Sequence, residues 1–77
     1  MTETTLDTLI IGQQAKIIRI QADKAIKRRM LDMGLVRGEI IKIKSMAPLG
    51  DPIEVVIKNY QLSLRKIEAQ QITVEVN

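Results

Sequence analysis

The sequence predicts a mainly β fold: five short antiparallel strands that close into a small barrel, with one α-helix inserted after the first strand. Segments rich in β-branched residues, most of them alternating apolar and polar side chains, recur along the chain and indicate the strands. One segment with helical periodicity interrupts them. The links between the later strands are short, which favours antiparallel pairing, and so small a sheet with one apolar face closes most economically into an SH3-like barrel.

The chain of 77 residues is expected to form one domain, over residues 1–77. Residues 1–5 are polar and are expected to be flexible. The sequence shows neither a basic leader nor a long apolar run, so we expect a soluble, cytosolic protein.

The first strand is predicted over residues 15–21 (AKIIRIQ), where β-branched side chains fit a pleated, half-buried surface. A turn at residues 12–14, which begins with a glycine, precedes it. Strand and turn together place the start of the sheet before the helix.

The helix is predicted next. Asp23 can cap its N-terminus by accepting a hydrogen bond from a free backbone N–H group, and Gly34 can end it in the left-handed conformation. At about 100° per residue, Ile26, Met30 and Met33 share one face. This face is predicted to pack on the barrel, with basic residues roughly opposite.

Four further strands are predicted after the helix, at residues 39–46, 53–58, 60–65 and 72–76. The second of these, IEVVIK, directs alternate apolar side chains inward, and the others alternate in the same way. Residues 66–71 (KIEAQQ) favour a helix but provide only about one turn of it.

The helix is basic: it carries Lys24, Lys27, Arg28 and Arg29, and Leu31 points into its cationic face. An apolar residue ringed by charge is typical of the core of a small docking interface. The alternative is a solvated face, with Leu31 packed under the preceding loop.

The segment APLGDP, residues 47–52, is predicted to link two strands. Pro48 and Pro52 restrict the backbone, and Gly50 accepts a dihedral angle that other residues avoid. A rigid loop that exposes Leu49 loses little conformational entropy when a partner covers it. The alternative is that Leu49 bends back over the mouth of the barrel.

The residues that are missing exclude several function classes. The chain has no histidine and no cysteine, which removes the commonest general base near neutral pH and the usual nitrogen and sulfur ligands of transition metals. We therefore expect no enzyme, no cofactor and no metal site. With Tyr60 as the single aromatic residue, base stacking is not available for reading nucleic acid.

A net charge of +3 still allows contact with an anionic partner. One alternative function is therefore non-specific binding of nucleic acid through the basic helix and Lys42, Lys44 and Lys58. A second alternative is a barrel that self-associates through exposed strand edges.

Three motifs in order along the chain, RRMLDMGLVRGEIIKI, APLGDPIEVVI and YQLSLRKIEAQQI, resemble the ferrous iron transport protein A (FeoA) family. The resemblance extends from about Leu9 to Val76. It implies an SH3-like barrel and a small cytosolic accessory protein, not an enzyme, that binds the cytosolic GTP-binding part of a FeoB-type ferrous iron transporter. The partner-binding residues that it suggests by position are Leu49, Gly50 and Asp51 in the loop, and Lys27, Arg28, Met30, Leu31 and Met33 on the helix.

Overall fold

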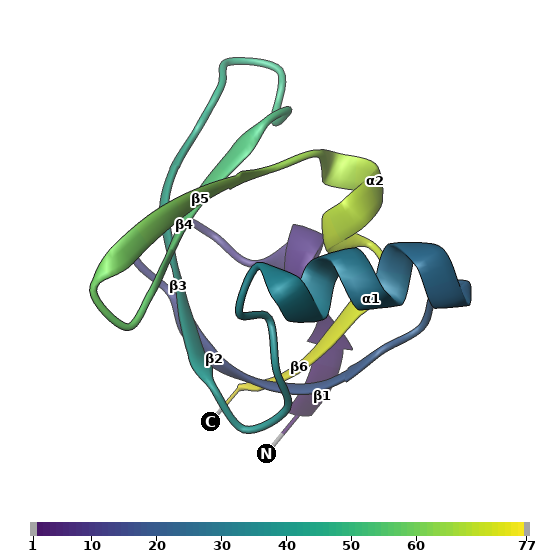
Figure 1. The fold of residues 1–77 in the computed structure, drawn as a ribbon. Coiled ribbons are helices and arrows are strands. Elements are labelled where there is room, and N and C mark those ends of the chain that lie inside the picture. The colour runs from purple at the N-terminus through teal and green to yellow at the C-terminus, as the bar shows by residue number, and fades with distance from the viewer. Residues whose placement is uncertain (1, 77) are drawn as a thin grey trace.

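A computed structural model describes residues 2–76 of the chain (Figure 1). Six strands, two α-helices and one 3₁₀ turn alternate along it. In chain order they are β1 (Thr2–Thr5), the 3₁₀ turn η1 (Leu6–Thr8), β2 (Gln14–Ile20), α1 (Lys24–Asp32), β3 (Ile40–Met46), β4 (Ile53–Ile57), β5 (Tyr60–Leu64), α2 (Lys66–Ala69) and β6 (Ile72–Val76).

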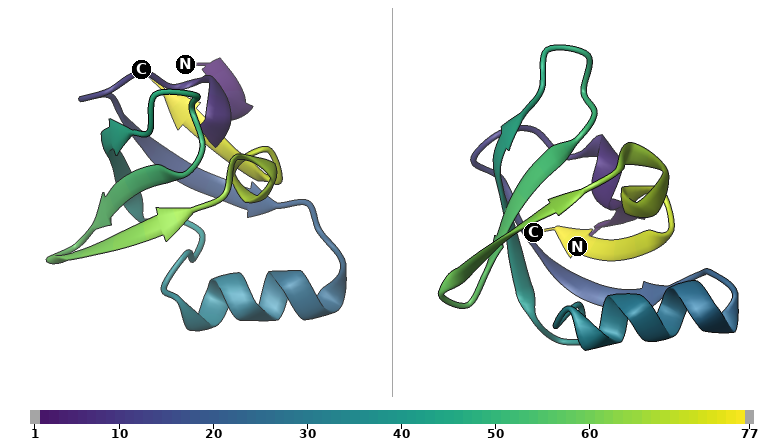
Figure 2. Two further views of the ribbon diagram at one scale, coloured as in Figure 1. Left: turned by 90° about the horizontal axis from the view of Figure 1, so that it is seen from above. Right: turned by 45° about the horizontal axis from the view of Figure 1, so that its top comes forward.

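The strands form one antiparallel sheet in the order β1-β6-β2-β3-β4-β5. Figures 1 and 2 show this sheet curling strongly on itself, with α1 lying outside it beside β2 and the short α2 near its open side. The mainly β fold with a helix inserted between the first two predicted strands is therefore confirmed.

The sheet has six strands, so the predicted number of five is wrong by one. The additional strand is β1, which pairs antiparallel with β6 in the register Thr2↔Val76 to Thr5↔Thr73. Residues 2–5 were expected to be flexible because they are polar, but an edge strand needs only backbone hydrogen bonds on one side, and threonine is β-branched. Met1 lies outside the described residues.

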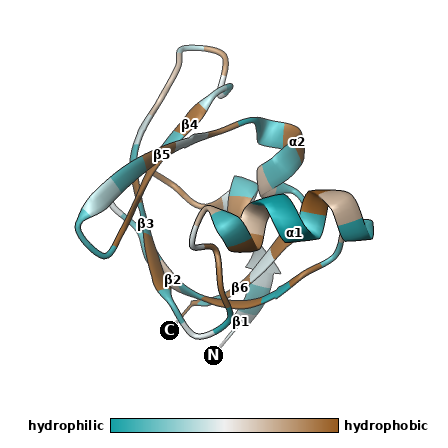
Figure 3. Cartoon of the chain, in the orientation of Figure 1, coloured by the Kyte–Doolittle hydropathy of each residue, from teal (hydrophilic) through white to brown (hydrophobic). Residues whose placement is uncertain are grey.

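The core fills the concave side of the sheet. In β4 the alternation is complete, since Ile53, Val55 and Ile57 are buried and the residues between them are half-buried. Leu6 in η1 and Leu35 after α1 are also fully buried and belong to the same core. Figure 3 shows the matching distribution, with apolar stretches along the central strands and a largely polar α1.

Both predicted ends of α1 are confirmed. The Asp23 carboxylate accepts a hydrogen bond from the Ile26 backbone N–H at 3.0 Å, which satisfies one of the free donors of the first turn. Gly34, with φ of +91°, ends the helix. The N–H of Leu35 then donates to the Met30 carbonyl at 3.0 Å and the N–H of Gly34 to the Leu31 carbonyl, also at 3.0 Å, the pattern of a Schellman motif.

None of the helices in the described part of the chain is long and apolar enough to cross a membrane.

Candidate docking surfaces

The loop of residues 47–52 links β3 to β4 and projects from the sheet at the top of Figure 1. Two backbone hydrogen bonds close it, from the Gly50 N–H to the Ala47 carbonyl at 2.7 Å and from the Ala47 N–H to the Pro52 carbonyl at 3.1 Å. Gly50 adopts φ of +79°, as its predicted role in the turn requires. The Leu49 side chain is 91% exposed, so the loop holds a leucine in solvent and does not fold it over the barrel.

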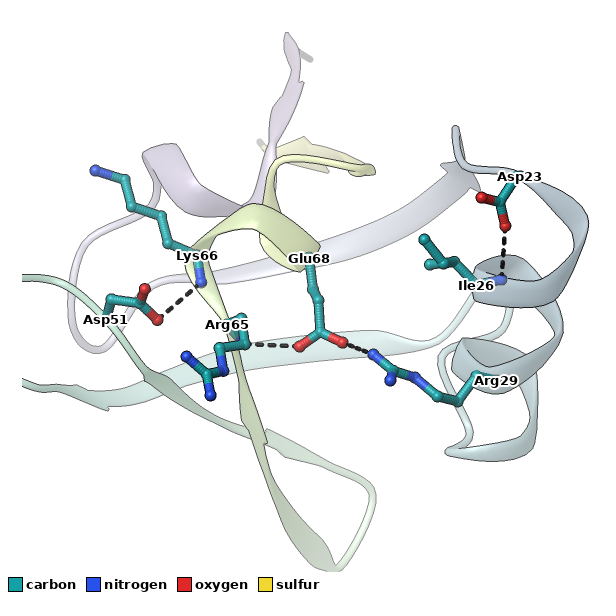
Figure 4. A network of polar contacts seen from close by, with 7 residues as sticks. All are labelled: Asp23, Ile26, Arg29, Asp51, Arg65, Lys66 and Glu68. Carbon is teal, nitrogen blue, oxygen red and sulfur yellow. Dashed lines mark hydrogen bonds and ion pairs between the residues drawn. The ribbon is translucent and has the colours of Figure 1, made fainter.

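Asp51 has a structural role in the same loop. Its Oδ1 atom accepts a hydrogen bond from the backbone N–H of Lys66 at 3.1 Å (Figure 4). This contact ties the loop to the first residue of α2. Of the three predicted loop contacts, Leu49 therefore points outward, Gly50 makes the turn and Asp51 anchors the loop.

An apolar hollow lies at the base of the loop, between Gly50, Met46 and the segment that precedes β2. Ile10 and Ile11 line it and are 70% and 60% exposed. The sequence prediction did not include these two isoleucines. The signal that could have found them is the unbroken run Leu9-Ile10-Ile11, in which only Leu9 is buried. Three consecutive apolar residues before a turn cannot all face one core.

The helix candidates divide into exposed and buried residues. Lys27 and Arg28 are exposed, and the Leu31 side chain is 44% exposed beside them. Met33 is half-buried against the core, and its carbonyl accepts a hydrogen bond from the Tyr60 hydroxyl at 2.8 Å. These positions leave Lys27, Arg28 and Leu31 accessible to a partner.

Met30 was predicted as a partner contact, and the structure contradicts this. Its side chain is fully buried in the hydrophobic core. Ile26, one turn earlier on the same helix face, also packs against this core. Met30 therefore fixes α1 to the sheet and is not available to a partner.

Polar contacts connect the short helix α2 both to the loop and to α1 (Figure 4). The Glu68 carboxylate forms an ion pair with Arg29 of α1 and accepts the backbone N–H of Arg65 at 2.8 Å. Asp51 accepts the neighbouring backbone N–H of Lys66, at the same N-terminal end of α2. Two candidate surfaces that are far apart in sequence are thus carried by one polar network.

The described residues show no constellation that suggests metal chemistry. Within residues 2–76 no group of three or more histidine, cysteine, aspartate or glutamate side chains could hold a metal ion. The exposed residues of the loop and of α1 offer a partner apolar contact area and positive charge.

Comparisons with known proteins agree on one family. The profile of the FeoA domain matches residues 4–76. Over 71 residues the chain is 39% identical to a Porphyromonas gingivalis protein named as a fusion of Fe(2+) transport protein A with the Fe(2+) transporter FeoB. The match covers 92% of this chain but 8% of the fusion protein.

Two solved structures show the same likeness. The solution structure of a FeoA-like protein from Clostridium acetobutylicum is 44% identical, with a TM-score of 0.90 over 99% of this chain and 90% of the other. The crystal structure of Stenotrophomonas maltophilia FeoA is 30% identical, with a TM-score of 0.82 over 94% of this chain and 89% of the other. That protein is described as a prokaryotic SH3 domain protein, complexed with zinc, and as a candidate activating factor of ferrous iron transport. The likeness confirms the predicted SH3-like fold.

Proposed function

The chain belongs to the FeoA domain family, and from this premise we propose that it is a cytoplasmic accessory protein of ferrous iron transport. In this proposal it is a binding module and not an enzyme, and it docks on the cytosolic GTP-binding part of a FeoB-type transporter.

The observation that carries this proposal is the fused relative, in which a segment similar to this chain and a FeoB transporter belong to one polypeptide. Fusion raises the effective concentration of one module at the other, which is useful when the two must meet. The matched segment makes up 8% of that fusion protein, and the transporter enters this proposal as the partner of the segment.

The surface that supports docking best is the loop with Leu49. Its backbone is fixed by internal hydrogen bonds and by the contact between Asp51 and Lys66, while Leu49 itself is 91% exposed. An apolar side chain on a preorganised support can be covered at small entropic cost. Ile10 and Ile11 extend the apolar area at the base of the loop.

We expect Leu49→Ala to weaken binding to the transporter's cytosolic domain by about fivefold or more, as truncation of an interface anchor does. Because Leu49 is 91% exposed, the free energy of unfolding should change by less than about 0.5 kcal/mol. Calorimetric titration measures the first quantity and urea denaturation the second.

Ile40→Thr is the matched control, since Ile40 is a half-exposed apolar residue at the opposite end of β3 and threonine keeps the preference for a strand. It should leave the affinity unchanged. Equal effects of both variants, or an unfolded Leu49→Ala protein, would contradict a docking role for Leu49. Binding to duplex DNA that falls steeply with salt, without binding to the transporter, would favour a nucleic-acid function instead.

A further inference from the structure

A groove separates α1 from β2, and it shares no lining residue with the hollow at the base of the loop. We call it the helix groove. It encloses about 220 Å³. Its apolar lining includes Leu31, Leu35 and Ile18, and its basic side chains are those of Arg19, Lys27 and Arg37.

A β-bulge in β2 explains why Ile18 reaches this groove. Ile17 pairs with Val74 and Arg19 pairs with Thr73, so Ile18 is the additional residue on the bulged strand. Ile17 and Ile20 stay buried in the core on either side of it, while Ile18 is only half-buried. The bulge thus presents an apolar side chain outside the core, toward α1.

The charged residues that line the groove are all basic. No carboxylate lines it, and Arg19 is the only one of its three cations that forms an ion pair within residues 2–76, with Glu3 at 3.0 Å. Lys27 and Leu31 also border a shallow depression on the outer side of α1, together with Lys24, Arg28 and Asp32. Leu31 therefore lies in a basic surrounding with Asp32 as its one acidic neighbour in these two hollows.

We propose that the helix groove binds an acidic segment of the partner protein that carries an apolar side chain. The apolar side chain would enter against Ile18 and Leu31, and flanking carboxylates would pair with Lys27 and Arg37. Arginine suits this role because its planar guanidinium can hold a carboxylate through two hydrogen bonds. The inference rests on the proposed function and names the chemistry of the segment that the transporter would contribute.

The size of the groove favours a protein segment over other anionic partners. At about 220 Å³ it is smaller than typical small-molecule pockets, which begin at about 300 Å³, and it suits a single side chain. Its apolar residues line a recess between two elements, whereas insertion into a lipid surface needs a protruding apolar face.

Charge reversal tests the proposal with the full-length transporter in nanodiscs of neutral phosphatidylcholine. Lys27→Glu combined with Arg37→Glu should weaken binding about fivefold or more, because attraction to carboxylates becomes repulsion. Lys42→Glu with Lys44→Glu makes the same charge change on the solvent side of β3 and should have a much smaller effect. Thermal unfolding of both double variants verifies that they fold.

Zero-length coupling with a carbodiimide identifies the segment, because it joins a lysine amine directly to a carboxylate in contact with it. We expect Lys27 to couple to a transporter segment in which acidic residues flank an apolar one, and Leu31→Ala to reduce this coupling.

Failure of the groove proposal can be distinguished from failure of the proposed docking function. If Leu49→Ala weakens binding while Lys27 does not couple and charge reversal at Lys27 and Arg37 has no more effect than the control, the groove proposal is overturned and docking stands. If the unmodified protein does not bind the transporter, the proposed function fails, and the groove proposal fails with it. Binding to phosphatidylglycerol vesicles that depends on Lys27 and Arg37, without coupling to the transporter, would replace the acidic segment by a lipid surface.

Discussion

Met30→Ala is expected to lower the free energy of unfolding by about 2–5 kcal/mol, the range for truncating a fully buried methionine. Met30 has no exposed surface and joins α1 to the core of the sheet. Small domains have about 0.05–0.15 kcal/mol of stability per residue, so this loss is a large fraction of the total free energy of unfolding of a chain of 77 residues. Urea denaturation monitored by far-ultraviolet circular dichroism measures the loss.

The neighbouring Leu31→Ala variant is the control for this prediction. Leu31 is 44% exposed, and alanine is the better helix former, so its stability should change by less than about 1 kcal/mol. If both variants lost the same stability, Leu31 would belong to the core and could not serve a partner. A loss below about 1 kcal/mol for Met30→Ala would show that α1 does not depend on this contact.

Gly34→Ala is expected to lower the free energy of unfolding by about 2–3 kcal/mol, for two separate reasons. At φ of +91° an L-residue is strained. A Cβ atom built at this position would also collide with the Tyr60 hydroxyl oxygen, which must then shift, and we expect this shift to break its 2.8 Å hydrogen bond to the Met33 carbonyl. The helix end and β5 are both disturbed by one methyl group.

Two further variants separate these causes. Gly38 has a similar φ of +93° but open space around a Cβ atom, so Gly38→Ala should cost only the strain, about 1–2 kcal/mol. In a Tyr60→Phe background the hydroxyl is absent, and the cost of Gly34→Ala should fall toward that of Gly38→Ala. A cost of Gly34→Ala that is the same with and without the Tyr60 hydroxyl would disprove the steric contact.

The parts of the fold that follow from local pattern could be predicted from the sequence. Asp23 and Gly34 mark the ends of α1 because their roles depend on backbone conformation within a few residues. Alternation in IEVVI located β4 correctly because each side chain of a strand faces either the core or the opposite side.

The parts that depend on distant contacts could not be predicted. Strand β1 exists because β6, at the other end of the chain, pairs with it. The bulge that presents Ile18 to the helix groove depends on the register between β2 and β6, which local alternation does not determine.

The candidate partner contacts also divide into residues whose burial follows from local pattern and residues whose burial does not. Met30 and Leu31 are adjacent, and helical periodicity placed Met30 correctly on the packing face, yet resemblance to the family grouped it with the exposed residues. Leu49 could have been buried or exposed from its sequence alone, and the structure places it in solvent. Which of these exposed residues meets a partner depends on the partner, which the chain does not encode.

The most direct test of the proposed docking is a titration of isotope-labelled protein with the isolated cytosolic domain of the transporter, with and without a GTP analogue, following backbone amide shifts. The proposal predicts shifts that cluster on residues 49–51 and around Lys27 and Leu31, with little change at the solvent side of β3. No shifts in either nucleotide state, or shifts confined to residues away from the loop and the helix groove, would contradict it.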